Sequence, residues 1–145
     1  MTPNEMRSEI NTFGAHLLRQ ELAIAFRGPI LKSYGNLVNV LSPWMNSIGA
    51  EGSAEDQDFG TVFEYLQLLR EQHYTIVLFD GAIIQLAYVF FRGELIKHRL
   101  CYYPCPVNVD FRNEEYESFV DFIEEAIVRD PLSLLRLRSP MRFAF

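Results

Sequence analysis

Residues 74–103 read YTIVLFDGAIIQLAYVFFRGELIKHRLCYY, three β-branched and aromatic runs separated by two short turns. Asp80-Gly81 between two such runs is the strongest short-range hairpin signal, because the turn needs positive φ at its centre. Arg92-Gly93-Glu94 marks the second turn. The stretch therefore predicts an antiparallel meander of three strands, over residues 74–79, 82–91 and 95–103.

The middle strand of this meander is mostly apolar on both faces, so we expect both faces to be covered by helices. Thr2-Pro3-Asn4-Glu5 supplies a capping hydroxyl, a proline at the first helical position and a glutamate at the third. An apolar stripe follows, and Gly28-Pro29 predicts that this first helix ends near Arg27. A second helix is expected over residues 61–72. A third is expected to be capped by Asn113 and to carry its apolar stripe from Tyr116 to Ile127.

The rest of the chain contains weaker signals. Residues 36–41 favour a short strand that Ser42-Pro43 ends, and the small, acidic residues 49–58 favour a surface loop. Leu135 and Leu137 alternate with arginines before Ser139-Pro140, which predicts a final strand with a proline at its end or edge. The sequence as a whole predicts an α+β fold: an antiparallel sheet of about four to five strands, with a central three-strand meander, covered by three helices.

Composition limits the class of protein. The chain has 145 residues, of which 49% are hydrophobic and 14% aromatic, enough for one compact domain over residues 1–145. A formal charge of -6 gives no general attraction to nucleic-acid phosphates and leaves only a local basic patch open. With two cysteines, no leader and no run of about 18 apolar residues, we expect a reduced cytoplasmic protein without a membrane span.

His98, Cys101 and Cys105 raise the question of a metal site. In a strand, residues 98 and 101 point to opposite faces and lie about 10 Å apart at ~3.3 Å per residue. Zinc needs ligands that converge within about 2.0 to 2.3 Å of one ion, and a fourth ligand. We therefore interpret both cysteines as packing residues and expect no metal and no cofactor.

His98 and the arginines are the candidate site residues. His98 shares a strand face with Ile96, Leu100 and Tyr102, and is either a hydrogen-bonded core residue or a catalytic acid or base. Arg99 lies on the other face of the strand. The densest positive charge is in the tail, so an anion-binding patch would comprise Arg99, Arg136, Arg138 and Arg142; alternatively these side chains are solvated partners of the acidic third helix.

The order of several motifs resembles a bacterial protein family of unknown function. The motifs are Phe26-Arg27-Gly28-Pro29-Ile30, Asp80-Gly81, His98-Arg99-Leu100 with Tyr102-Tyr103-Pro104-Cys105-Pro106, and Arg138-Ser139-Pro140-Met141-Arg142-Phe143. The resemblance implies a small prokaryotic accessory protein from a mobile-element, toxin-antitoxin or phage-defence setting. It also implies an acidic residue soon after the final Arg-Phe pair, where this chain has Ala144, and a histidine-bearing segment beyond Phe145.

Two functional hypotheses follow. The first is an interaction module, completed by a protein partner or by self-association through surplus apolar surface that includes Phe143-Ala144-Phe145. The second is a nucleic-acid-processing or phosphoester enzyme in which His98 acts as acid or base and three arginines, Arg99, Arg138 and Arg142, hold a phosphate. We favour the first hypothesis.

Overall fold

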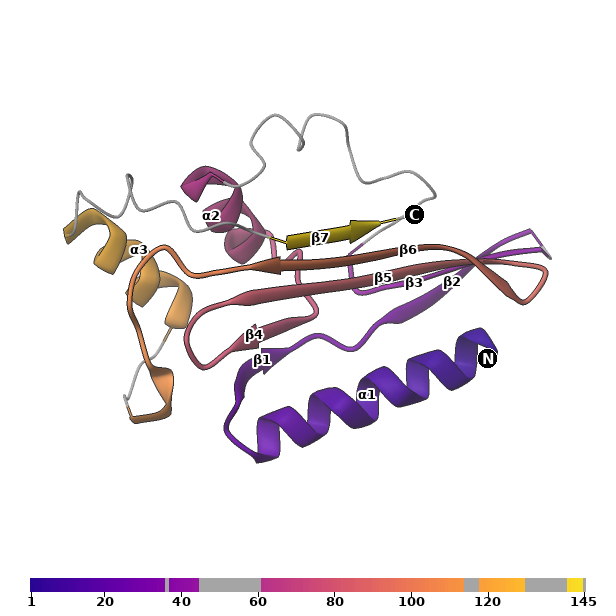
Figure 1. Ribbon diagram of the computed structural model, residues 1–145, viewed down its shortest axis with the longest axis horizontal. Helices are drawn as coiled ribbons and strands as arrows, with labels where there is room; N and C mark the ends of the chain where they lie inside the picture. Colours follow the sequence, from indigo (N-terminus) through magenta and orange to yellow (C-terminus); the bar gives the residue numbers. More distant parts are fainter. Residues whose placement is uncertain (36, 45–60, 114–117, 130–140, 145) are drawn as a thin grey trace.

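The computed structural model describes residues 1–35, 37–44, 61–113, 118–129 and 141–144. In these residues seven strands form one antiparallel sheet, with helices packed on it (Figure 1). In chain order the elements are α1 (Pro3–Arg19), β1 (Ala23–Phe26), β2 (Ile30–Tyr34), β3 (Val38–Ser42), α2 (Val62–Arg70), β4 (Ile76–Leu78), β5 (Ile83–Phe91), β6 (Glu94–Tyr103), a 3-10 turn (Phe111–Asn113), α3 (Phe119–Arg129) and β7 (Met141–Ala144). The α+β fold is confirmed, and the sheet has more strands than the four to five expected.

The predicted meander is present as β4, β5 and β6. The β4–β5 turn contains Gly81 at φ 82°, and Asp80 Oδ1 accepts a hydrogen bond from the Ala82 amide at 3.0 Å. The β5–β6 turn contains Arg92 and Gly93, both at positive φ. Because L residues with a Cβ rarely adopt positive φ, glycine at both turns fixes where the strands reverse.

The sheet branches at β5. One edge of β5 pairs with β6 along its whole length, whereas the other edge is shared between β4, at Ile83 and Ile84, and β3, at residues 88–91. Strand β1 lies outside β4, β2 lies outside β3, and β7 lies outside β6. In the gap between β4 and β3, Thr75 Oγ1 accepts a hydrogen bond from the Leu86 amide at 2.9 Å. The Thr75 hydroxyl therefore accepts the hydrogen bond that the backbone of a neighbouring strand would otherwise accept from β5 at that point.

The first helix is shorter than predicted. It begins with the expected capping box at Thr2 but ends at Arg19, not near Arg27. Leu22 N donates to Leu17 O, and Glu21 has φ 58°, which is the geometry of a Schellman motif with glutamate in the place usually taken by glycine. The residues that follow form β1, which pairs with β4. Residues 23–26 therefore form a strand because they pair with β4, although their apolar spacing is also compatible with a helix.

The other helices agree in part with the predictions. Helix α2 spans Val62–Arg70 and is capped by Thr61, as expected for residues 61–72. Helix α3 begins at Phe119, where Ser118 Oγ accepts from the Asp121 amide, so the predicted cap at Asn113 is wrong. Asn113 instead ends the 3-10 turn.

The remaining strands agree only in part with the predictions from the sequence. The predicted strand over residues 36–41 is present as β3, and β2 was not predicted. The last strand, β7, follows Pro140, whereas the expected strand at residues 135–138 and the loop at 49–58 lie outside the described residues.

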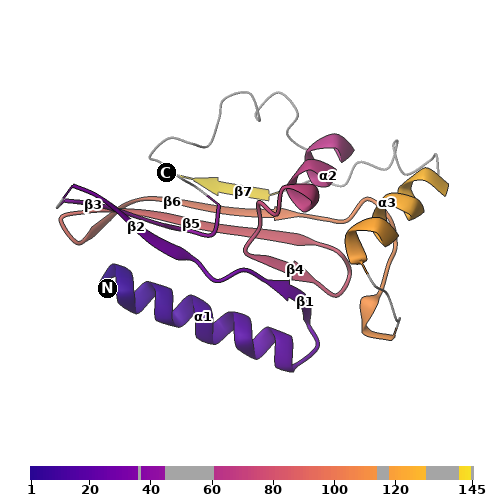
Figure 2. The ribbon, with the colours of Figure 1, turned by 180° about the vertical axis from the view of Figure 1, so that it is seen from behind.

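The helices lie on opposite faces of the sheet (Figures 1 and 2). Helix α1 runs along β1, β2 and β3 on one face, where Ile10 and Leu17 pack with Leu41, Phe90 and Ile76. Helices α2 and α3 cover one end of the other face in the largest apolar cluster. Within the described parts of the chain, no helix is long and apolar enough to cross a bilayer.

Candidate functional site

His98 and Arg99 lie on opposite faces of β6. His98 pairs with Tyr88 and Arg99 with Ala87, and directly opposed residues of an antiparallel ladder share a face. Tyr88 packs in the cluster under α1, whereas Ala87 packs in a cluster on the other face, with Val40 and Val89. The two candidate residues therefore do not converge on one ligand.

Arg99 belongs to the face that bears α2. Its Nε donates to Oε1 of Gln85 at 3.3 Å, and the Gln85 amide nitrogen donates to the carbonyl of His73 at 2.7 Å. Gln85 is buried. In the β6–β7 ladder Arg142 stands opposite Cys101, two residues along β6 from Arg99. The structure thus places Arg99 and Arg142 at neighbouring ladder positions, while Arg136 and Arg138 lie outside the described residues.

Cys101 and Cys105 are buried thiols in the cluster formed with α2 and α3. Beside Cys105, the Tyr65 hydroxyl donates a hydrogen bond of 2.5 Å to the carbonyl of Gly81. Burial, reinforced by the neighbouring Cys105, raises the pKa of Tyr65 well above its ordinary value. The surroundings of both cysteines are those of packing residues.

Among the described elements, α1 covers only about half the width of its side of the sheet. Helix α1 packs on β1, β2 and β3, at one edge of the sheet, and β7 lies at the opposite edge (Figures 1 and 2). On this side of β6, Leu95 is opposite Phe90 and is 45% exposed, and Leu100 is opposite Leu86 and is 40% exposed. Two large apolar side chains of β6, Leu95 beside the β5–β6 turn and Leu100 in the second half of the strand, are thus left half-exposed by the described helices.

We call this uncovered half of the sheet the open face. It consists of six residues whose side chains are half-buried or exposed on the α1 side of two neighbouring strands: Leu95, His98, Leu100 and Tyr102 of β6, and, at its border with α1, Leu86 and Tyr88 of β5, which also pack on the cluster under α1. The β7 ladder places Phe143 opposite Leu100 and Met141 opposite Tyr102. Of the six residues of the open face, all except His98 are apolar or aromatic, so the open face is a largely apolar surface with one imidazole.

A bulge limits the open face. The register shifts between Val89 and Phe90, and Ile96 is the extra residue on β6. The alternation that would place Ile96 on the same face as His98 is therefore interrupted at this bulge. Ile96 is 57% exposed beside the open face.

One flank of the open face is formed by α1. A Cβ on Gly14 would contact the Phe26 ring, and Asn11 Oδ1 lies close to Gly28, so this side of α1 faces the β1–β2 edge. At 100° per residue, Phe13 leaves the helix about 160° away from Asn11, counted through the buried side. Phe13 is 50% exposed and therefore borders the open face on the side of β5.

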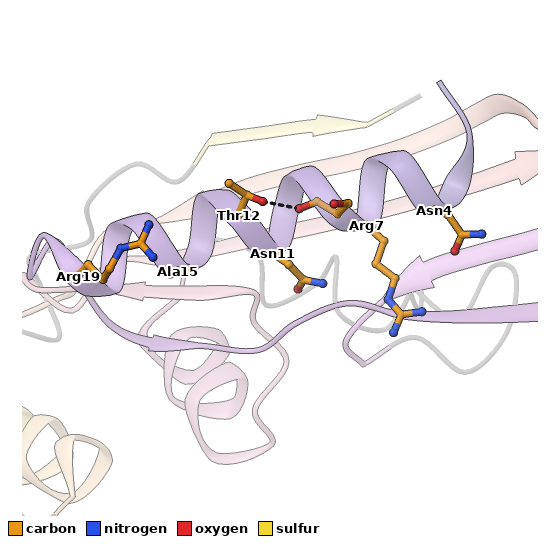
Figure 3. Close-up of a pocket in the computed structure, with 7 residues that line it drawn as sticks. Asn4, Arg7, Asn11, Thr12, Ala15 and Arg19 are labelled. Carbon is orange, nitrogen blue, oxygen red and sulfur yellow. Dashed lines mark hydrogen bonds between the residues drawn. The ribbon is translucent and has the colours of Figure 1, made fainter.

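A surface depression also lies on α1 itself. The outer side of α1 carries Arg7, Asn11 and Arg19 around a depression (Figure 3). Every residue that lines this depression comes from α1, and Thr12 Oγ1 donates to Ser8 O within it. One helix surface encloses no ligand, so this depression is not the candidate site.

Strand alternation in the sequence groups His98, Leu100 and Tyr102 with Ile96, whereas the bulge puts Leu95 on their face in place of Ile96. The face was also expected to be covered by a helix. The sequence carries no signal for the exposure of this face, because an apolar strand face has the same pattern whether or not a helix covers it.

Comparisons with known proteins identify a family without a described activity. No curated protein and no solved structure matches the chain. A family model described as an uncharacterized conserved protein, DUF2290, matches residues 30–145, from β2 to the last residue. The chain therefore belongs to this uncharacterized family, in agreement with the resemblance noted from its motifs.

Proposed function

We propose that this chain is an interaction module that binds a protein partner, or a second copy of itself, through the open face. The observation that carries the proposal is the exposure of Leu95 and Leu100 on a strand that the described helices leave uncovered. Burying a leucine side chain fully contributes about 1.5–3 kcal/mol, so these two half-exposed residues offer about 2 kcal/mol to a partner. Contiguous apolar surface of this kind is typical of binding sites.

The biological setting is part of the proposal and rests on the family resemblance. It is that of a small bacterial, cytoplasmic accessory protein in a toxin-antitoxin or phage-defence system.

The enzymatic alternative draws no support from the site geometry. It requires His98 and Arg99 to act on one phosphate, but the two side chains leave β6 on opposite faces. A phosphate held by Arg99 would lie on the α2 side of the sheet, with the full thickness of the sheet between it and His98.

The test is a charge placed on the open face. Leu100→Lys puts an ammonium into the proposed interface, and burial of an unpaired charge there is costly. The matched control is Val128→Lys on α3, where the side chain is 80% exposed and the same charge is added to a helix on the opposite face of the sheet. Tagged wild-type and variant proteins are expressed in the native host, and co-purifying proteins are quantified by mass spectrometry beside light scattering of the purified chain.

We expect one protein, or the second copy, to be retained by the wild type and by Val128→Lys and to decrease at least tenfold with Leu100→Lys. Equal retention by all three proteins would refute the open face as the binding surface.

A further inference from the structure

We infer that the element that binds the open face is an amphipathic α-helix of a different protein, lying beside α1 and carrying basic residues along the flank that meets α1. This inference rests on the proposed function and names the class of partner. It follows from the width of the open face, from the position of α1 and from the charges beside Phe13.

The width of the open face matches one helix. Strands β5, β6 and β7 span two inter-strand steps, which is about 10 Å at 4.7–4.9 Å per step. An α-helix with its side chains is about 10–12 Å across. One helix therefore covers these three strands in the same way as α1 covers the strands beside them.

Helix α1 provides the second wall for such a partner. It has 17 residues, which at 1.5 Å per residue is about 25 Å, and it runs along the strands (Figure 1). Helices that pack side by side lie about 8–10 Å apart. At that spacing the half-exposed Phe13 ring faces the partner helix and provides the contact between the two.

The flank of α1 beside Phe13 carries one carboxylate, Glu9, towards its N-terminal half, whereas His16 and Arg19 lie on the same surface towards its C-terminal end. Glu9 is exposed and lies one turn before Phe13, on the same side of the helix. The chain as a whole carries a formal charge of -6, which disfavours a second copy and favours a basic partner. A lysine or arginine opposite Glu9 would add a charge pair at the rim of an otherwise apolar contact.

Photo-crosslinking in the native host tests the inference because the spacing of the crosslinked sites in the partner depends on its rise per residue, which differs between a helix and a strand. The photoreactive amino acid p-benzoylphenylalanine is placed at position 98, 100 or 102, and at Thr12 on the outer side of α1 as the control. Positions 98 and 102 are about 13 Å apart along β6. A helix covers that distance in about nine residues, whereas an added strand covers it in about four.

We expect positions 98, 100 and 102 to crosslink to one partner segment that carries basic residues, with the sites reached from 98 and 102 about nine residues apart. The control at position 12 should give no such product. Glu9→Lys should reduce the yield from position 100 several-fold, whereas Glu71→Lys, beside α2 on the opposite face, should leave that yield unchanged.

Two other outcomes overturn the inference in distinguishable ways. A spacing of about four residues, or crosslinks to a second copy of this chain, would refute the helix of a different protein and leave protein binding by the open face in place. The absence of any crosslink from all three positions of β6 would refute the proposed function together with this inference.

Discussion

Replacing Thr75 by valine tests whether its hydroxyl satisfies the β5 backbone at the point between β4 and β3 where no strand pairs with it. Thr75 is fully buried, and its Oγ1 lies 2.9 Å from the Leu86 amide and 3.4 Å from the Leu86 carbonyl oxygen. Valine has nearly the same shape but offers no acceptor. The variant therefore leaves a buried backbone amide without its partner, at a cost of about 1–3 kcal/mol.

The midpoint of that range is large enough to measure. For a chain of this length a loss of about 2 kcal/mol lowers the melting temperature by about 6 °C. Thermal unfolding followed by circular dichroism gives this shift, and amide hydrogen exchange resolves its origin, since exchange at Leu86 should accelerate relative to the rest of β5.

Thr75→Ser is the control because it keeps the hydroxyl and removes only a methyl group. Its Leu86 amide should stay protected, although the lost methyl costs about 1 kcal/mol. A Thr75→Val variant as stable as the wild type, or equal protection of Leu86 in both variants, would show that the hydroxyl does not bridge the gap in the sheet.

Three further predictions concern the turn at Gly81 and the open face. Because burial raises the pKa of Tyr65, the unfolded chain loses this proton near pH 10 while the folded chain retains it. Stability should therefore fall as the pH rises above about 10, and pH-dependent denaturation should show a shallower fall in Tyr65→Phe. Gly81→Ala should cost more stability than Gly93→Ala in urea unfolding, because both sites have positive φ but only at Gly81 would the new Cβ meet Cys105 Sγ, at 2.9 Å; equal costs would exclude that contact as the cause. Leu100→Lys should leave the unfolding free energy of the purified monomer within about 0.5 kcal/mol of wild type, and a larger loss would show that Leu100 serves the fold.

The meander could be predicted because its signals are local. Gly81 and Gly93 stand where the backbone needs positive φ, and the runs between them are rich in β-branched and aromatic residues. Hairpin turns of this kind depend on the residues at the turn itself, with little influence from the rest of the chain. The bounds of β4, β5 and β6 accordingly fall within about two residues of the prediction.

The end of α1 could not be predicted because the usual glycine after a helix is absent and the apolar spacing continues beyond the end of the helix. The left-handed position after the helix is occupied by Glu21 instead of glycine, and Leu22 and Ala25 continue the apolar spacing of the helix. What ends the helix is the pairing of β1 with β4, residues about 50 positions away. Long-range pairing of this kind overrides local propensity.

The sequence predicts which residues of β6 share a face for most of the site, but it does not predict that this face is exposed. Alternation along β6 correctly separates His98 from Arg99, and this separation is what the register shows. Whether that face is covered depends on where α1 lies across the sheet, which is a tertiary property. An apolar strand face that binds a partner and one that binds the protein's own helix have the same pattern in the sequence.

The shared edge of β5 has a consequence for how the sheet is held together. The ribbon of β1 and β4 and the ribbon of β2 and β3 pair with different segments of β5 and are joined to each other on one face by α1, which packs on both. Within the sheet, the β5–β6 hairpin is therefore the element that both ribbons share. The open face is built on that common hairpin, so a partner bound there would hold together the part of the sheet on which both ribbons depend.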